Sequence, residues 1–262
     1  MSHQQHADNV EGITPYCRDT CKHEQVQQMF DNIAASYDRL NAMMTFGMYR
    51  RWLRSLVSEA ANATPTHVLD IATGTGDVAL ALAHKIPQAH IDGIDLSQGM
   101  LDVAAAKISR EAPDVAGRIV LKCGDALALP YDDSTFDVIT VAYGVRNFDN
   151  LARGYAEMYR VLRPGGKLLV LELSTPSSSL VRLPYKLYVR CAIPTMGRLV
   201  SKDSRAYHYL PESVAAVPAR EDMCRLMTRA GMSETCWREF FLGVCTLYTA
   251  TKPCQPKRNI AQ

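Results

Sequence analysis

The sequence of 262 residues predicts an α/β protein with a doubly wound, mainly parallel sheet, and two observations carry this prediction. First, apolar runs rich in Val and Ile alternate with stretches of helical periodicity, as in a parallel sheet covered on both faces. Second, the apolar run at residues 68–71 breaks into a glycine loop that leads directly into a helical stretch starting near Val78. A strand, a tight loop and a helix in this order form a ligand site at the carboxyl edge of such sheets.

The elements that follow keep this alternation. Four further strands are expected at residues 91–96, 119–123, 136–142 and 167–173. The helix after the second strand has Ser97 as a candidate N-cap and an apolar face that includes Met100 and Ile108. The helix after the fourth strand is expected to end at the Arg-Pro-Gly-Gly turn of residues 163–166.

The chain has no internal repeat or low-complexity linker, which predicts one domain. We expect a mobile polar tail at residues 1–23, the domain at residues 24–253 and a short tail at residues 254–262. Helical periodicity at residues 24–63, ahead of the first strand, predicts a helical cap over the ligand edge of the sheet. Residues 174–213 are longer than an ordinary crossover and predict a helical insertion after the fifth strand.

Composition excludes several classes of protein. The formal net charge of +2 gives no electrostatic case for nucleic-acid binding, and 47% hydrophobic residues suffice for a large core. The polar N-terminus lacks the apolar stretch of a signal peptide, and no apolar run reaches the length of a membrane span. Eight scattered cysteines indicate a reduced, cytoplasmic protein. Cys17, Cys21 and His23 match no structural zinc spacing, so we expect no metal site.

The glycine loop alone is ambiguous about its ligand. Gly74 and Gly76 give a passable match to a dinucleotide fingerprint. Asp70, within the preceding strand, would be a buried carboxylate that needs partners. Loop amides or the ammonium group of a ligand would provide them, whereas a pyrophosphate would gain nothing from this carboxylate. This reasoning favours S-adenosylmethionine over NAD.

Acidic residues also follow the next two strands. Asp95 ends the second strand and Asp125 follows the third, so both are expected in the crevice beside the glycine loop. Asp95 is placed to accept hydrogen bonds from two ribose hydroxyls, and Asp125 from an exocyclic adenine amine. Each residue alone has helix capping as an alternative role, but their common position at strand ends favours a cofactor site.

Several motifs together resemble the ubiquinone/menaquinone biosynthesis C-methyltransferases, a family of class I S-adenosylmethionine-dependent enzymes. The matching segments are residues 29–34, 37–38, 40–41, 70–77, 95, 128–130, 136–137, 144–147, 159–167 and 207–213. The resemblance covers residues 24–253. It implies a Rossmann-like methyltransferase fold with a seven-stranded sheet whose last strand is antiparallel, closed by residues 236–241 and 244–251.

The resemblance also implies which residues bind the cofactor. By position in the motifs, Thr75, Asp95, Asp125 and Ala126 would contact S-adenosylmethionine beside the glycine loop. Ala142 stands near the cofactor where some members of the family have a serine, so a backbone contact can persist there but a hydroxyl contact cannot.

The implied reaction is methyl transfer to a ring carbon of a reduced prenylated quinol. The segment 241–252 resembles menaquinone-pathway members more than ubiquinone ones, which favours conversion of demethylmenaquinol to menaquinol. The alternatives are methylation of 2-polyprenyl-6-methoxy-1,4-benzoquinol in ubiquinone biosynthesis and methylation of an oxygen or nitrogen of a small molecule. An NAD-dependent dehydrogenase and a noncatalytic cofactor-binding protein are further alternatives from other classes.

A ring carbon becomes nucleophilic when the neighbouring phenol, whose pKa is about 10, loses its proton. Arg146 is permanently charged and is expected to hold the phenolate oxygen or polarise a water beside it, with Asn147 orienting it. Tyr37 and His208 are candidate proton acceptors or hydrogen-bond partners. A salt bridge that closes the loop is the alternative role of Arg146, and an exposed helical position that of His208.

The insertion has six basic residues against two acidic ones. The basic residues are Arg182, Lys186, Arg190, Arg198, Lys202 and Arg205. Pro184 is expected to start a helix and Pro194 to end one. A basic amphipathic segment predicts peripheral contact with the inner face of an anionic membrane, and a soluble cover over the sheet is the alternative. The sequence leaves the oligomeric state open, and a homodimer is compatible with it.

Overall fold

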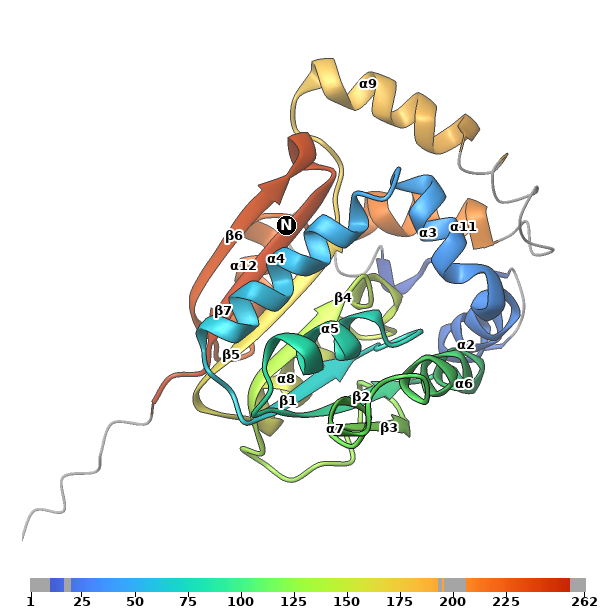
Figure 1. Ribbon diagram of the computed structural model, residues 1–262. Helices are drawn as coiled ribbons and strands as arrows, with labels where there is room; N and C mark the ends of the chain where they lie inside the picture. Colours follow the sequence, from blue (N-terminus) through green and yellow to red (C-terminus); the bar gives the residue numbers. More distant parts are fainter. Residues whose placement is uncertain (1–9, 17–19, 193–194, 196–205, 255–262) are drawn as a thin grey trace, which may run out of the picture.

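A seven-stranded sheet forms the centre of the molecule, with helices on both faces (Figure 1). The structure is a computed structural model that describes residues 10–16, 20–192, 195 and 206–254. The strands are β1 (His67–Ile71), β2 (His90–Asp95), β3 (Ile119–Cys123), β4 (Phe136–Ala142), β5 (Leu162–Leu173), β6 (Ser233–Phe240) and β7 (Cys245–Thr251). Their spatial order is β3-β2-β1-β4-β5-β7-β6, and only the pairings that involve β7 are antiparallel. The predicted sheet, with its last strand antiparallel, is confirmed.

Two layers of helices bury the two faces of the sheet. One layer consists of α4 (Tyr49–Asn62), α5 (Asp77–Lys85), α6 (Gln98–Ile108) and α7 (Pro113–Ala116). The other contains α8 (Leu151–Val161) and α12 (Glu221–Arg229). Successive residues of β1 alternate between them, because Val68 packs with the first layer and Leu69 with the second. Burial on both faces explains the continuous apolar runs of the strands.

A third group of helices covers the carboxyl ends of β1, β2 and β4. It consists of α2 (Lys22–Ile33), the 3₁₀ turn η1 (Ala34–Ser36), α3 (Tyr37–Met44), α9 (Ser179–Leu187), the π-helical η3 (Tyr188–Ala192) and α11 (Ala206–Ala216). Its core includes Met29, Leu40 and Tyr209. The carboxylate of Asp31 fixes α2 to α6, since it accepts a hydrogen bond at 2.9 Å from the backbone N–H of Gly99. Short 3₁₀ turns follow β4 (η2, Val145–Asn147) and β6 (η4, Phe241–Gly243).

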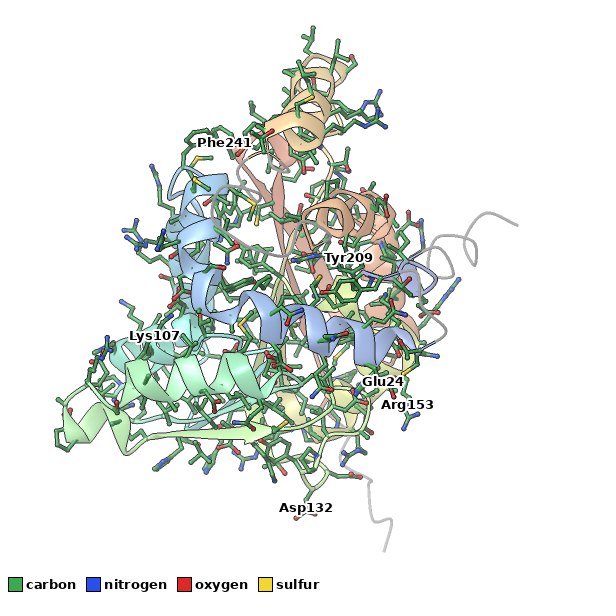
Figure 2. All side chains as sticks on the ribbon, turned by 90° about the vertical axis from the view of Figure 1, so that its right-hand side faces the viewer. Glu24, Lys107, Asp132, Arg153, Tyr209 and Phe241 are labelled. Atoms are coloured by element: carbon green, nitrogen blue, oxygen red, sulfur yellow. The ribbon has the colours of Figure 1, made fainter. Side chains whose placement is uncertain are left out.

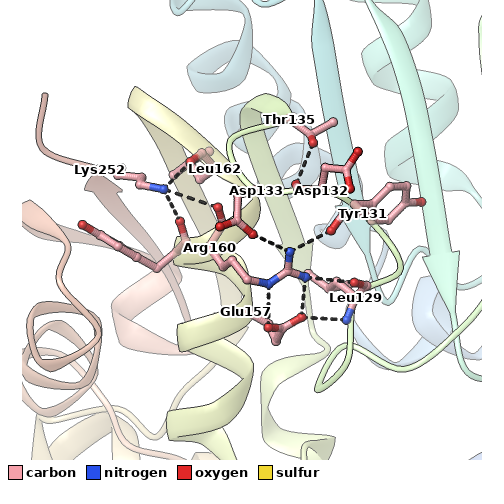
Figure 3. A network of polar contacts seen from close by, with 10 residues as sticks. Leu129, Tyr131, Asp132, Asp133, Thr135, Glu157, Arg160, Leu162 and Lys252 are labelled. Atoms are coloured by element: carbon pink, nitrogen blue, oxygen red, sulfur yellow. Dashed lines mark hydrogen bonds and ion pairs between the residues drawn. The ribbon is translucent and has the colours of Figure 1, made fainter. Parts of the chain in front are cut away.

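The opposite end of the sheet is held by a network around Arg160 (Figure 3). Its guanidinium donates to both carboxylate oxygens of Glu157, to Asp133, and to the backbone carbonyls of Leu129 and Tyr131. The network therefore joins the C-terminal end of α8 to the loop that enters β4. All three guanidinium nitrogens of Arg160 have partners, as expected of a structural arginine.

The prediction of a mobile tail through residue 23 does not hold for its described part, residues 10–16 and 20–23. Val10 is fully buried and Tyr16 nearly so. Lys22 is also buried, and its ammonium donates to the carbonyls of Val10 and Phe148 at 2.7 and 3.2 Å. The carboxylate of Glu11 accepts a hydrogen bond from the first backbone N–H of α8. The polar residues of this segment serve as tertiary anchors, which composition alone does not reveal. Residues 1–9 and 17–19 lie outside the described part.

The insertion also begins differently from the prediction. Helix α9 starts at Ser179, and Pro184 lies inside it rather than at its start. A proline in a helix removes one backbone hydrogen bond, a cost that an exposed and short helix tolerates more easily than a buried one. Pro194, Arg198, Lys202, Asp203 and Arg205 lie outside the described residues, as does the C-terminal tail after residue 254.

Candidate active site

Two adjoining cavities lie at the carboxyl ends of the central strands. The first, which we call the polar cavity, is lined by Gly74, Asp95, Asp125, Ala126 and Ala142, with contributions from α2. The second, the apolar cavity, has a volume of about 360 Å³ and is enclosed mainly by the cap helices and α9. Four residues line both cavities and so mark their junction: Phe30, Tyr37, Tyr143 and Asn147. A molecule in one cavity can therefore meet a molecule in the other at this junction.

The glycine loop has the sharply turned backbone that its sequence predicts. Gly74 and Gly76 have φ values of +57° and +81°, which side chains with a Cβ rarely adopt. A Cβ on Gly76 would lie 3.0 Å from that of Ala104, so this glycine lets α5 pack closely against α6. Gly74 lines the polar cavity, whereas Gly76 does not.

Asp95 connects the glycine loop to α6. Its Oδ2 accepts a hydrogen bond from the N–H of Gly74 at 2.8 Å, and its Oδ1 accepts one from the N–H of Ser97 at 2.9 Å. Burial raises the pKa of Asp95, and these backbone hydrogen bonds oppose that shift. Each oxygen keeps a second lone pair for a ligand hydroxyl, so the carboxylate is held rigidly as a bidentate acceptor.

Asp125 forms the far side of the polar cavity. Its Oδ1 accepts a hydrogen bond from the N–H of Leu127 at 2.8 Å, and its Oδ2 lies 3.8 Å from Nδ1 of His23. His23 belongs to α2 and also lines this cavity. The sequence predicts no role for His23 in this cavity, because no local pattern places α2 beside the carboxyl end of β3.

Asp70 has hydrogen-bond partners within the protein itself. It is 1% exposed and lies outside the polar cavity. Its two oxygens accept hydrogen bonds from the hydroxyls of Thr73 at 2.6 Å and Thr140 at 2.7 Å. Burial raises its pKa to about 7, although both hydroxyls lower it. Asp70 therefore has partners that the sequence argument did not include, because β4 places Thr140 beside it, and its contact with a cofactor stays a prediction.

Thr75 also faces away from the polar cavity. Its hydroxyl donates to Oδ1 of Asp38 in α3 at 2.6 Å, and the residue is 3% exposed. Asp38 and Asp77 both pair with the ammonium of Lys107, at 2.5 and 2.6 Å. The hydroxyl thus ties the glycine loop to the cap, and the contact of Thr75 with a cofactor stays a prediction.

The guanidinium of Arg146 is buried at the wall of the apolar cavity. It is 6% exposed, and its NH1 donates to Oε1 of Glu172 at 2.6 Å and to the carbonyl of Tyr143 at 2.5 Å. Burial opposes the charge, but Glu172 and the other acidic groups nearby outweigh it and raise the pKa of Arg146. Its Nε–H has no hydrogen-bond partner among the described residues. Arg146 thus makes a salt bridge, which was its alternative role in the sequence, and its partner Glu172 was not predicted.

A second buried polar group, the hydroxyl of Tyr143, lies at the junction. It is next to the thiol of Cys245, a weak hydrogen-bond partner, and has no oxygen or nitrogen partner among the described residues. Burial, with the neighbouring Cys245 thiol, raises the pKa of Tyr143 well above its usual value, which keeps the hydroxyl protonated. Tyr143 has a φ of +59°, a strained conformation that is concentrated at functional sites. A tyrosine directly after a predicted strand was the signal that could have identified it.

The remaining candidates act as donors or positioning groups. Asn147 accepts a hydrogen bond from the hydroxyl of Tyr209 at 3.1 Å, which ties η2 to α11. Burial raises the pKa of Tyr37, although the nearby Arg146 lowers it. Tyr37 is therefore a hydrogen-bond donor near neutral pH, which argues against its predicted role as proton acceptor. His208 lies in α11, but its side chain is outside the described part of the chain.

The chain matches the ubiE/COQ5 methyltransferase family over residues 18–252. It belongs to this family. The demethylmenaquinone methyltransferase of Bacteroides fragilis is 43% identical over 92% of this chain and 98% of its own length. A ubiquinone/menaquinone biosynthesis C-methyltransferase of Geobacter sulfurreducens is 41% identical over 92% and 93%.

Solved structures agree with this assignment at the level of the fold. A SAM-dependent methyltransferase of Thermotoga maritima, described as a possible histamine N-methyltransferase, matches with a TM-score of 0.60 and 20% identity. The match covers 86% of this chain and 99% of that one. The [4+2]-cyclase SpnF matches with a TM-score of 0.65 and 19% identity, over 88% and 96%. The chain is a methyltransferase with the class I fold, and S-adenosyl-L-methionine is its cofactor.

Proposed function

We propose that this methyltransferase converts demethylmenaquinol to menaquinol by methylating a ring carbon. The observation that carries the proposal is the apolar cavity, which joins the polar cavity at Tyr37, Tyr143 and Asn147 and has the unpartnered Nε–H of Arg146 in its wall. An aromatic, lipid-soluble quinol ring fits such a space better than a polar substrate does. The similarity to relatives named demethylmenaquinone methyltransferase supports the same substrate class.

The polar cavity has the groups that S-adenosyl-L-methionine requires. Asp95 would accept the ribose hydroxyls, and Asp125 with Ala126 would hold the adenine. Gly74 and Ala142 line the same cavity and leave room beside the backbone, because neither has a side chain longer than a methyl group. When bound, the cofactor supplies an electrophilic methyl group on a positively charged sulfur.

In the apolar cavity the protein has to favour the ionised quinol. The guanidinium of Arg146 donates to the quinol oxygen and stabilises the phenolate, whose charge then spreads onto the ring carbon. The buried hydroxyl of Tyr143 serves as a second donor at the junction. Glu172 holds the guanidinium in place through the bond to NH1, which leaves Nε free for the substrate. We propose His208 as the group that accepts the quinol proton.

We further propose that the chain acts in the cytoplasm, at the inner face of the membrane that holds its prenylated substrate. No helix within the described residues is long and apolar enough to cross a bilayer. The proposal is the same for a monomer and for a homodimer.

The proposal is tested with the purified protein, S-adenosyl-L-methionine and two reduced substrates, demethylmenaquinol and 2-polyprenyl-6-methoxy-1,4-benzoquinol. We expect C-methylation of the naphthoquinol at the higher kcat/KM. A preference for the benzoquinol would assign the chain to ubiquinone biosynthesis instead. Cofactor binding without methylation of either quinol, or of an oxygen or nitrogen acceptor, would identify a noncatalytic binding protein.

A further inference from the structure

Large apolar side chains are exposed together around one end of the apolar cavity. Of eight such residues among those described, six come from the α3–α4 turn, α9 and η4. These six, which we call the apolar rim, are Phe46 (75% exposed), Leu180 (87%), Leu183 (74%), Leu187 (66%), Phe241 (56%) and Leu242 (67%). Phe46 and Phe241 also line the cavity, so the rim is continuous with its wall. Contiguous exposed apolar surface of this kind marks an interaction site.

Helix α9 has two apolar faces, although a surface helix normally has one. Val181 and Tyr185 line the apolar cavity. Leu180, Leu183 and Leu187 recur at helical spacing on another side and are exposed. Val181 and Tyr185 are partly buried, so the first face attaches the helix to the domain. The second face has no partner within the described residues.

The charged residues beside these leucines are all basic. Arg182, Lys186 and Arg190 follow one another four residues apart and are all exposed, so they form a basic stripe next to the leucines. No Asp or Glu occurs in residues 174–192. A helix that presents leucines flanked by Lys and Arg can lie at the surface of an anionic bilayer, with its leucines among the acyl chains and its cations at the headgroups.

The tip of the β6–β7 hairpin is an independent indication of an interaction surface. Phe241 and Leu242 have φ values of +45° and +58°, in the left-handed region that disfavours side chains. Both side chains are more than half exposed, so burial within the domain does not offset this conformational cost. Figures 1 and 2 place this tip at the same end of the molecule as α9. Two consecutive strained and exposed apolar residues are expected where they gain burial against a partner.

We propose that the apolar rim docks onto the surface of an anionic lipid bilayer, so that the apolar cavity opens toward the membrane. The proposal rests on the proposed function, because a prenylated quinol resides in the bilayer and has to leave it to reach Arg146. Docking would let the ring enter the cavity while the prenyl tail remains in lipid. The basic stripe favours an anionic bilayer over a second copy of this chain, because two copies facing through α9 would bring their basic stripes together.

The test is flotation of the full-length chain with vesicles of phosphatidylglycerol and phosphatidylethanolamine, and with vesicles of phosphatidylcholine alone. We expect binding to the anionic vesicles that weakens at high salt. Replacing the three leucines of the rim in α9 (Leu180→Gln, Leu183→Gln, Leu187→Gln) should lower vesicle binding by more than about tenfold. Val120→Gln is the matched control, since Val120 is 59% exposed on edge strand β3, and it should bind as the unmodified chain does.

Activity and self-association separate this proposal from the others. The triple variant should methylate a short-chain, water-soluble demethylnaphthoquinol at the normal rate and a long-chain quinol in vesicles more slowly. Absence of binding by the unmodified chain, or unchanged binding by the triple variant, would overturn the docking proposal. Loss of a dimer in sedimentation velocity, without vesicle binding, would assign the rim to a second copy. Vesicle binding without methylation of demethylmenaquinol would refute the proposed function and leave the docking proposal standing.

Discussion

Two arginines at opposite ends of β4 show how this protein separates stability from chemistry. Arg160 lies near the start of the strand, and each of its guanidinium nitrogens has a partner (Figure 3). Arg146 follows the end of the strand, pairs with Glu172 and keeps Nε unpartnered at the wall of a cavity. A fully paired cation holds elements together, whereas a buried cation with one free donor is poised to bind a substrate. The difference identifies the functional end of the sheet without reference to any ligand.

The largest effect is expected from Arg146→Ala. Loss of a donor to the developing phenolate should lower kcat by about 10²- to 10³-fold, the usual cost of removing such a group. Cofactor affinity should stay near normal, because Arg146 does not line the polar cavity. Single-turnover rates and calorimetry with S-adenosyl-L-methionine measure the two quantities. Unchanged turnover would remove Arg146 from the mechanism.

Two further variants control this experiment. Arg146→Ala leaves Glu172 buried without its cation, which is destabilising, so Arg146→Lys should be measured beside it: it keeps the charge but lacks the Nε donor. Arg160→Ala should lower the free energy of unfolding by about 1–2 kcal/mol, because its network is partly exposed, with little change in turnover. An equal loss of turnover in Arg160→Ala would show that the two ends of β4 do not differ in function.

A second contrast concerns the polar and apolar cavities. Asp95→Asn removes the charge and one acceptor beside Gly74, so S-adenosyl-L-methionine should bind about 10- to 100-fold more weakly. The kcat at saturating cofactor should change much less, since Asp95 does not line the apolar cavity. Calorimetry and saturation kinetics separate these outcomes. A large fall in kcat with unchanged affinity would contradict the division of roles between the cavities.

The pH dependence of the free energy of unfolding tests the burial of Asp70 within the protein. Its pKa is about 7 in the folded chain and about 3.9 when unfolded, so between these pH values the folded state binds more protons than the unfolded state. The contribution of Asp70 to stability is therefore lost as pH rises from about 4 to about 7. Asp70→Asn should abolish this dependence, and its free energy of unfolding relative to the unmodified chain should increase over that range. Chemical denaturation at several pH values measures it, and parallel curves for the two proteins would refute the prediction.

The smallest effect is expected at Ala142. Ala142→Ser restores a hydroxyl next to the polar cavity, and one additional hydrogen bond is worth about 0.5–1.5 kcal/mol, or roughly a 2- to 10-fold gain in cofactor affinity. The rate at saturating cofactor should not change. A weaker affinity would show that the space beside Ala142 is needed for the cofactor itself.

Much of the fold was accessible from local patterns in the sequence. Residues 119–123 and 136–142 were predicted with the bounds that the structure shows, because each is an apolar run bordered by polar residues or glycine. The positions of Asp95 and Asp125 also followed from local sequence, since the end of a strand fixes where the next side chain lies. The ends of helices and the start of β5 were less accurate, because short turns carry weaker signals.

Three pairings could not be predicted in this way. Asp70 with Thr140, Thr75 with Asp38, and Arg146 with Glu172 each join residues from different elements. Such partners depend on strand register and on how the cap sits on the sheet, and neither is encoded in the spacing of nearby residues. For this reason Asp70 and Thr75 were assigned to the cofactor, although the structure uses both internally.

The sequence by itself therefore determined the doubly wound sheet, the glycine loop, the acids at the strand ends and the family. These features are local, because each depends on the order of residues within one or two elements. Only the tertiary structure decided which polar groups are already satisfied and which remain free for a ligand. That distinction arises when distant segments pack together. Packing leaves the Nε–H of Arg146 without a partner at the wall of the apolar cavity, and it leaves the hydroxyl of Tyr143 without an oxygen or nitrogen partner at the junction of the two cavities.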